Sequence, residues 1–251
     1  PGVVNIVTGR GAVLGPALVQ HPLTAKVAIT GQTETGKKVM QMAVDGLKHV
    51  SLELGGHTPL IVFEDADLPK AVEGGVYRSF RNMGQICNAV NRIYVQNSIF
   101  DRYVEEFVKA TQKLTIGHGL ENPDLGAMCT LGGVQKSQAH VADAVAKGAK
   151  VLAGGKAPEG AQYARGFFFE PTVLVNVNHD MLVMKEETFG PLAPIMGFDT
   201  VEEAIAYAND TPYGLVAYIY TNNLKTMYRV SEELECGTVG VNNVAGGEFP
   251  Y

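Results

Sequence analysis

One cysteine of this 251-residue chain lies in a segment whose composition could support nucleophilic chemistry. Cys87 follows Gly84 by three residues, in a loop that we expect just after a helix. A backbone N–H in such a loop could help to hold an oxyanion beside the thiol. Most lone cysteines are instead buried small apolar residues. Cys129 and Cys236 are interpreted in that way, because neither lies in a loop of this kind.

Two further segments place carboxylates beside glycines. In residues 52–56 the alternation of a strand sends Glu53 to the side opposite two leucines, where a partly desolvated carboxylate could act as a general base. A solvated glutamate at a strand end is the alternative. Residues 186–191 combine two glutamates, an aromatic ring and a Gly-Pro turn. There Glu187 could hydrogen-bond a ribose, and Phe189 could pack against a flat ring.

The loop at residues 31–36 lies between an expected strand and an expected helix. Its glycines can turn tightly, and the N-terminus of the helix presents free N–H groups to a phosphate. This gives Gly31, Gln32 and Thr33 a possible role in binding a nucleotide. The spacing fits neither G-x-G-x-x-G nor Walker A, so an ordinary turn with Thr33 as the cap is the favoured interpretation of the loop by itself.

Short apolar runs alternate with longer helical patterns along the chain, which predicts the α/β class with a parallel or mixed sheet covered by helices. The expected strands are 3–7, 26–30, 50–54, 59–63, 92–96, 151–153, 167–170, 173–177, 192–197, 215–220 and 238–241. The expected helices are 11–21, 33–44, 67–81, 98–113, 134–147, 201–209 and 224–233. Ser98 is expected to cap the fourth of these helices. Asp67 is expected to cap the third, with Pro69 in its first turn.

Composition narrows the range of partners. With 46% apolar and 18% charged residues, the chain can bury a sizeable core. Its net charge is -6 with both signs interspersed, so we expect it to bind neither nucleic acid nor a membrane surface. No run of 18 apolar residues and no signal-peptide pattern is present, so a cytoplasmic location is expected. The three widely spaced cysteines argue against a disulfide framework and a metal site.

Residues 52–56, 84–87 and 187–191 occur in the order and at the separations found in NAD(P)-dependent aldehyde dehydrogenases, which the chain resembles from end to end. Glu53 and Cys87 are 34 residues apart, and Cys87 and Glu187 are 100 apart. The resemblance implies that Cys87 attacks the aldehyde carbon, giving a thiohemiacetal and then a thioester, and that Glu53 activates the hydrolytic water. It implies that Glu187 binds the nicotinamide ribose and that Phe189 packs near the nicotinamide.

The same resemblance places Gly31, Gln32 and Thr33 in the pyrophosphate loop for NAD or NADP. The family usually has a serine where this chain has Gln32. The residues that would distinguish the two cofactors belong to a segment of the family that precedes Pro1, as does the asparagine of the oxyanion hole.

Within the family, residues 80–87, 187–194 and 211–215 look most like those of succinate-semialdehyde dehydrogenases. Arg81 aligns with an arginine that contacts the substrate carboxylate in that subfamily, and a guanidinium suits a carboxylate geometrically. A structural arginine in a salt bridge is the alternative. Ala89 stands where some members have a second cysteine, so a disulfide switch is not expected. Residues 242–251 depart from the subfamily pattern, in which a further carboxylate contact is expected.

The adjacent glycines Gly55 and Gly56 predict a domain boundary. The resemblance then implies three parts: residues 1–53 as a partial, Rossmann-type dinucleotide-binding domain, 54–237 as the catalytic domain, and 238–251 as a connection back toward the cofactor domain. It covers about the middle half of a family member, so we expect a piece of a longer protein that forms a dimer or tetramer when complete. Two alternatives stay open: a cysteine-dependent esterase that uses Cys87 and Glu53, and a non-catalytic structural or oligomerisation fragment.

Overall fold

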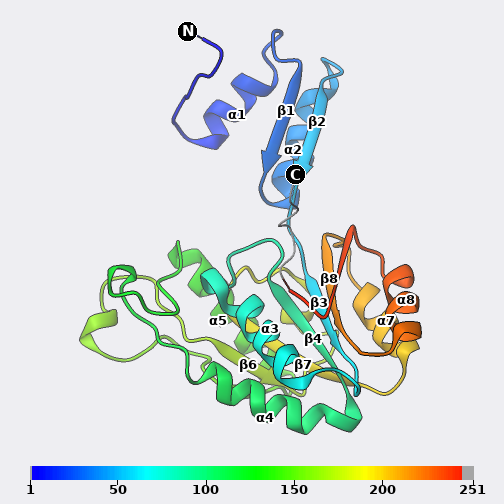
Figure 1. The fold of residues 1–251 in the computed structure, drawn as a ribbon. Helices are drawn as coiled ribbons and strands as arrows, with labels where there is room; N and C mark the ends of the chain where they lie inside the picture. Colours follow the sequence, from blue (N-terminus) through cyan, green and yellow to red (C-terminus); the bar gives the residue numbers. More distant parts are fainter. Residues whose placement is uncertain (1, 245–251) are drawn as a thin grey trace. The chain divides into compact units, whose positions relative to one another are not determined.

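The chain forms two compact units, Pro1–Gly55 and Gly56–Tyr251, and it passes from one to the other between two adjacent glycines. The structure is a computed structural model that describes residues 2–244 (Figure 1). The larger unit contains the loop with Cys87.

The first unit is built on a strand-helix-strand arrangement. Its elements are α1 (Gly11–Val19), β1 (Lys26–Thr30), α2 (Thr33–Val44) and β2 (His49–Glu53). The two strands pair in parallel, which requires a crossover such as α2 between them. The small core of this unit consists of Val19 from α1 together with Val39 and Ala43 from α2. The strand and helix predicted at 26–30 and 33–44 are confirmed.

The strand predicted at residues 3–7 is wrong, because this segment has no regular secondary structure. The side chains of Val3, Val4 and Ile6 are almost fully exposed. A strand forms only where its backbone N–H and C=O groups find a partner strand, and the pairing of the first unit is confined to β1 and β2 among the described residues. An apolar run by itself is therefore not enough to form a strand.

The second unit is built around a seven-stranded sheet in the order β5-β6-β7-β4-β3-β8-β9. Its strands are β3 (Thr58–Val62), β4 (Val90–Gln96), β5 (Lys150–Ala153), β6 (Thr172–Val175), β7 (Leu192–Phe198), β8 (Val216–Tyr220) and β9 (Thr238–Val241). Every neighbouring pair is parallel except β5 and β6. All five residues of β3 are buried, as expected for a parallel strand covered on both faces. The predicted α/β class is confirmed.

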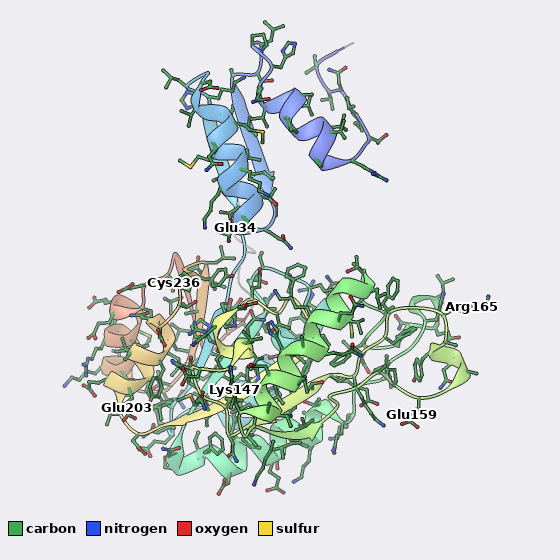
Figure 2. The ribbon with its side chains drawn as sticks, turned by 180° about the vertical axis from the view of Figure 1, so that it is seen from behind. Glu34, Lys147, Glu159, Arg165, Glu203 and Cys236 are labelled. Atoms are coloured by element: carbon green, nitrogen blue, oxygen red, sulfur yellow. The ribbon has the colours of Figure 1, made fainter. Side chains whose placement is uncertain are left out.

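Helices cover the two faces of this sheet. They are α3 (Leu68–Phe80), α4 (Phe100–Thr111), α5 (Leu131–Ala146), α6 (Leu182–Lys185), α7 (Val201–Asn209) and α8 (Leu224–Glu233). Seen from opposite sides, α3 lies in front of the sheet in Figure 1 and α5 lies in front of it in Figure 2. The helix α3 begins as predicted: the Asp67 carboxylate accepts a hydrogen bond from the N–H of Lys70, and Pro69 lies in the first turn.

Two details of the second unit differ from the sequence-based expectations. Residues 167–170 form no strand, because Phe167 makes a single isolated bridge with Met128. Ser98 does not cap α4, since it lies in a short 3-10 turn and its hydroxyl donates to Glu64 instead. The strand predicted at 238–241 is confirmed as β9, which pairs with β8 in the sheet. Residues 245–251 of the expected connecting segment lie outside the described residues.

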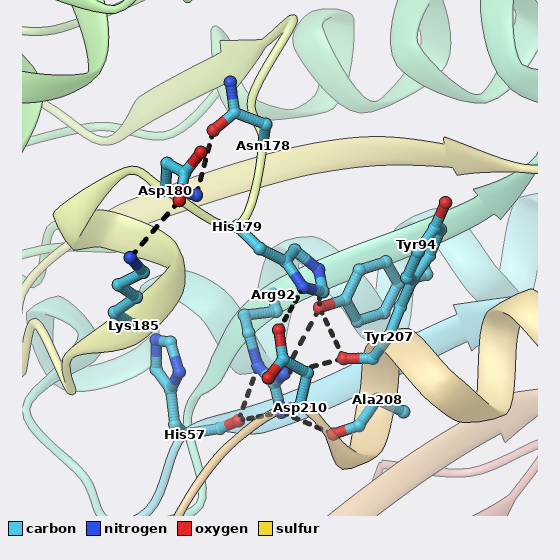
Figure 3. Close-up of polar contacts among 10 residues, drawn as sticks. All are labelled: His57, Arg92, Tyr94, Asn178, His179, Asp180, Lys185, Tyr207, Ala208 and Asp210. Atoms are coloured by element: carbon cyan, nitrogen blue, oxygen red, sulfur yellow. Dashed lines mark hydrogen bonds and ion pairs between the residues drawn. The ribbon is translucent and has the colours of Figure 1, made fainter.

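A buried arginine joins the beginning of β3 to the end of α7 (Figure 3). The side chain of Arg92 on β4 is fully buried. Its Nε and Nη2 donate to the carbonyl oxygen of His57 at 3.0 and 2.9 Å. It also donates to the carbonyls of Tyr207 and Ala208, which lie at the C-terminal end of α7, where helix carbonyls lack partners within the helix. Backbone carbonyls thus compensate for the buried charge.

Tyr94 extends this network toward the surface. Its hydroxyl accepts a hydrogen bond from Arg92 and donates one to the carbonyl of Tyr207. The same hydroxyl lies 3.1 Å from Nε2 of His179, whose Nδ1 is 2.7 Å from Asp210 (Figure 3). Burial raises the pKa of Tyr94 to about 12, so this hydroxyl keeps its proton at physiological pH.

The Arg92 network predicts a large loss of stability in Arg92→Met. The substitution takes the Arg92 donors from the buried carbonyl oxygens of His57 and Ala208, each loss costing about 1–3 kcal/mol, so the free energy of unfolding should fall by at least about 2 kcal/mol. Urea denaturation measures it. The control is Arg229→Met, because Arg229 forms exposed ion pairs with Glu202 and Glu233, and it should cost less than about 1 kcal/mol. Equal losses in the two variants would contradict this assignment.

Candidate functional site

The segment that leads to Cys87 follows a strained turn. Asn82, Met83 and Gly84 have φ angles of 55°, 60° and 68°, in the left-handed region. This conformation costs a residue with a side chain roughly 1–2 kcal/mol, and such strain persists where the surroundings impose it. Met83 meets that condition, because its side chain is almost completely buried in the core. The turn carries the chain from α3 into the loop with the cysteine.

Gln85 closes this turn from within and attaches it to a neighbouring segment. The side chains of Asn82 and Gln85 each donate to the other's backbone carbonyl, at 2.9 and 3.1 Å. The Gln85 side-chain oxygen accepts a hydrogen bond from the N–H of Cys129 at 2.9 Å. Gln85 belongs to the motif at residues 84–87, whose sequence indicates no separate role for it. Its two functional groups fix the turn two residues before Cys87.

Two close backbone contacts bring three distant segments together. A Cβ atom on Gly56 would collide with the carbonyl oxygen of Cys87, and one on Gly84 would collide with the carbonyl oxygen of Gly190. No side chain fits at either glycine without moving a backbone. The cysteine loop therefore lies directly against residue 56 and against the loop at 186–191.

Glu187 is held at the same place. Its Oε1 accepts a hydrogen bond of 3.1 Å from the N–H of Gly56, the glycine packed on Cys87. Burial raises the pKa of the Glu187 carboxyl, against the opposing effects of the Gly56 N–H and the charge of Lys136. Two residues later, Phe189 has a φ angle of 53° and exposes 42% of its side chain. A carboxylate and an accessible aromatic ring thus border the cysteine loop.

Three polar residues of α5 hold the loop at 186–191 in place. Lys136 donates a hydrogen bond to the carbonyl of Glu187, and Ser137 packs against Gly190. His140 is buried, with Nδ1 3.0 Å from the hydroxyl of Thr188. Burial and the nearby Lys136 lower the pKa of His140, so its imidazole is neutral at pH 7. Sequence reasoning missed these residues; the available signal was the run of polar side chains at positions i, i+1 and i+4 of an otherwise apolar helical face.

Arg81 lies at the end of α3 with its side chain exposed. Its guanidinium carbon is 5.4 Å from the centre of the Tyr77 ring. Within residues 2–244 no carboxylate forms an ion pair with Arg81, so the alternative of a structural salt bridge finds no partner there. The guanidinium is exposed, and Arg81 lies six residues before Cys87 in the chain.

The other two cysteines differ from Cys87 in their surroundings. Cys129 is exposed, so our interpretation of it as a buried apolar residue is wrong. Cys236 is partly buried, and burial raises the pKa of its thiol. No disulfide links the three cysteines.

In the first unit, the sequence-predicted residues lie around the ends of the two strands. Glu53 is the last residue of β2 and is exposed, and its carbonyl accepts a hydrogen bond from the N–H of Gly31. Thr33 is the first helical residue of α2, so Gln32 and not Thr33 occupies the cap position. The Gln32 side chain forms no capping hydrogen bond. The first N–H groups of this 12-residue helix can therefore donate hydrogen bonds to a phosphate, and a Cβ on Gly31 would meet nothing closer than 3.8 Å.

Among residues 2–244, no group of three or more His, Cys, Asp or Glu side chains is arranged to hold a metal ion. None of the helices described there has both the length and the apolar character needed to cross a bilayer.

Comparison with known proteins identifies the family. The model of the aldehyde dehydrogenase family matches residues 1–250. The chain belongs to this family. The resemblance drawn from residues 52–56, 84–87 and 187–191 is thus confirmed, and so is the α/β fold.

Relatives within the aldehyde dehydrogenase family include semialdehyde dehydrogenases. The chain is 48% identical over 242 residues to a succinate-semialdehyde dehydrogenase (NADP(+)) of Escherichia coli strain K12, covering 96% of this chain and 49% of that protein. It is also 48% identical to a glutarate-semialdehyde dehydrogenase of Pseudomonas putida, with the same coverage. The crystal structure of an E. coli NADP-dependent enzyme matches with a TM-score of 0.95 and 47% identity, covering 98% of this chain and 50% of that one. The chain spans about half the length of the curated relatives it matches.

Glu187 predicts a pH-dependent difference in stability. Because burial raises its pKa above the ordinary value of 4.5, the folded state binds more protons than the unfolded state just above that pH. The contribution of this carboxyl to stability is therefore most favourable below pH 4.5 and is lost as pH rises through the raised value. Glu187→Gln removes this loss.

We therefore expect the free energy of unfolding of Glu187→Gln, measured relative to that of the parent protein, to be higher at pH 7 than at pH 4. Urea denaturation of both proteins at both pH values measures it. Glu232→Gln is the matched control, because Glu232 is an exposed glutamate on α8. A Glu187→Gln difference that does not change with pH would contradict the burial of this carboxylate.

Proposed function

We propose that this protein oxidises a short aldehyde with a carboxylate at its far end, of the succinate-semialdehyde type, to the corresponding acid with NAD or NADP. The observation that carries the proposal is the packing of the Cys87 loop against Gly56, which holds Glu187, and against Gly190. The names of the semialdehyde dehydrogenase relatives support the substrate class.

The proposed reaction proceeds through bonds made and broken at Cys87. The thiolate attacks the aldehyde carbon, so a C–S bond forms and the carbonyl oxygen takes up the electron pair and a proton. The thiohemiacetal carbon then gives up its hydrogen as a hydride, for which a nicotinamide cofactor would be the acceptor, while the oxygen loses its proton and the C=O bond forms again. The resulting thioester is hydrolysed by a water molecule that Glu53 deprotonates. The C–S bond then breaks, releasing the acid and restoring the thiolate.

We propose cofactor contacts for Gly31, Gln32, Thr33, Glu187 and Phe189. The first N–H groups of α2, with Gly31, Gln32 and Thr33, suit the pyrophosphate because no side chain caps them. Glu187 suits a ribose hydroxyl, since its carboxylate is fixed by Gly56. Phe189 suits the nicotinamide ring, because it is a large aromatic side chain left accessible on a strained backbone. These features do not distinguish NAD from NADP.

Arg81 would bind the distal carboxylate of the substrate. Its guanidinium is exposed, is not used in an ion pair within the described part of the chain, and is steadied by the ring of Tyr77. We further propose that the full-length protein is a cytoplasmic dimer or tetramer, as the family resemblance implies. Sedimentation equilibrium of the full-length protein tests the oligomeric state.

Cys87→Ala tests the reaction. In the full-length protein this substitution should abolish aldehyde-dependent formation of reduced cofactor, because no other thiol lies in the turn beside Glu187. Cys129→Ala and Cys236→Ala are matched controls and should retain most of the activity. Reduced-cofactor formation that survives in Cys87→Ala would overturn the assignment. Ester hydrolysis without any cofactor reduction would favour the esterase, and a lack of both activities in the parent protein would favour the non-catalytic fragment.

Arg81→Ala tests the substrate class. A charge-assisted hydrogen bond is worth about 1.5–3 kcal/mol, so kcat/KM for succinate semialdehyde should fall about 10- to 150-fold while that for butanal changes little. Arg81→Lys should recover part of the loss, because it keeps the charge but not the planar fork. The ratio of the two substrates on each variant is the measurement, since a folding defect lowers both rates together. Equal losses for both aldehydes would show that Arg81 does not bind the carboxylate of the substrate.

A further inference from the structure

A second arginine lies on α3, one turn before Arg81, in a different environment. Arg78 is buried, with 3% of its surface exposed. Its Nη1 donates a hydrogen bond of 3.1 Å to the side-chain oxygen of Asn88, and its Nη2 donates to the carbonyl of Val244. Asn88 is the residue directly after Cys87. The guanidinium is therefore connected to the cysteine loop by a side-chain hydrogen bond, from an element that precedes the loop.

The charge of Arg78 is not compensated by a carboxylate in the described part of the chain. There, the arginine that forms ion pairs is Arg229, on the surface. The Nε of Arg78 is buried and has no hydrogen-bond partner among residues 2–244. A buried charge of this kind is costly unless an opposite charge lies near it. A thiolate on Cys87, beside Asn88, would supply that charge.

The other groups near the cysteine differ from Arg78, which offers a buried positive charge to a thiolate. The guanidinium carbon of Arg78 is 5.7 Å from the centre of the Tyr218 ring on β8. Burial raises the pKa of Tyr218, against the opposing effect of Arg78 and with a smaller contribution from Cys87, so the phenol stays neutral. From the loop before β7, the carboxylate of Glu187 opposes a thiolate, and at the end of α3 the exposed Arg81 is screened by solvent.

We propose that Arg78 is a positioning residue for the nucleophile: it fixes the Cys87 loop through Asn88 and, as a buried permanent cation, favours the thiolate form of Cys87. The two arginines of α3 then have separate tasks. Arg81 faces solvent and can meet a ligand, whereas Arg78 has its donors directed at protein groups and acts through the cysteine. This inference rests on the proposed function only in taking Cys87 as the nucleophile.

The test is the pH dependence of alkylation of Cys87 by iodoacetamide in the full-length protein, followed by peptide mass spectrometry without aldehyde or cofactor. In Arg78→Gln the midpoint of the rate profile should move up by about one pH unit, which lowers the rate at pH 7 about ten-fold. Arg78→Lys keeps the charge and should move the midpoint by less than half as much. Arg229→Met, which removes an exposed arginine far from the loop in sequence, should leave the profile unchanged.

A second measurement separates positioning from substrate binding. Arg78→Gln should lower kcat/KM by a similar factor for succinate semialdehyde and for butanal, in contrast to Arg81→Ala. Asn88→Ala keeps the charge of Arg78 but removes its link to the loop. Its alkylation midpoint should therefore shift by less than half as much as that of Arg78→Gln, while kcat falls for both aldehydes. If Arg78→Gln does not fold, Arg78→Lys and Asn88→Ala still test the two parts of the proposal.

An unchanged alkylation midpoint in folded Arg78→Gln would overturn the electrostatic role. A loss confined to the charged aldehyde would assign Arg78 to the substrate instead, which also overturns it. Because alkylation is measured without substrate, this proposal can fail while Cys87→Ala still abolishes aldehyde oxidation. Conversely, an active Cys87→Ala protein would overturn the proposed function and leave the effect of Arg78 on the thiol measurable.

Discussion

The contact between the backbones of Gly84 and Gly190 is the constraint on which the candidate site depends. The carbonyl oxygen of Gly190 occupies the space that a side chain at residue 84 would need. The cysteine loop and the loop that carries Glu187 can therefore pack without an intervening side chain. The left-handed turn at 82–84 is the backbone path that this contact imposes, and its strain is tolerated because Met83 is buried.

The same unit contains two buried arginines whose environments differ. Arg92 is surrounded by carbonyl oxygens, including two at the end of α7, so its charge is compensated by partial negative charges that are always present. Arg78 has two such partners and an unsatisfied Nε. We therefore regard Arg92, whose charge is compensated by surrounding carbonyl oxygens, as a structural residue. Arg78 donates a hydrogen bond to Asn88, so in our proposal its incompletely compensated charge acts on the thiol of the preceding residue, Cys87.

The sequence predicts a helix or strand well where nearby side chains determine it, and less well where pairing with a distant strand determines it. The crossover helix 33–44 and the cap at Asp67 depend on periodicity and on one side chain, and both are found as expected. The strands at 3–7 and 167–170 had suitable composition but no continuous partner, which a pattern along the chain does not reveal. For the site, spaced motifs indicated Cys87 and Glu187. They did not indicate Gln85, Lys136 or Arg78, whose roles arise from contacts between distant segments.

The titration behaviour of the second unit follows one pattern. His57 and His140 have lowered pKa values because burial disfavours the imidazolium, and Tyr218 has a raised pKa because burial disfavours the phenolate. These buried groups therefore carry no charge near neutral pH. The charges around the cysteine loop and the loop at 186–191 include those of Glu187, fixed on Gly56, of Lys136 on α5, and of Arg78 and Arg81 at the end of α3. Arg78 is buried whereas Arg81 is exposed, so an interaction of Arg78 with a neighbouring charge is screened less than one of Arg81. In the roles that we propose, the thiolate and the substrate carboxylate each have their own cation, and Arg78 and Arg81 supply the two from positions three residues apart at the end of α3.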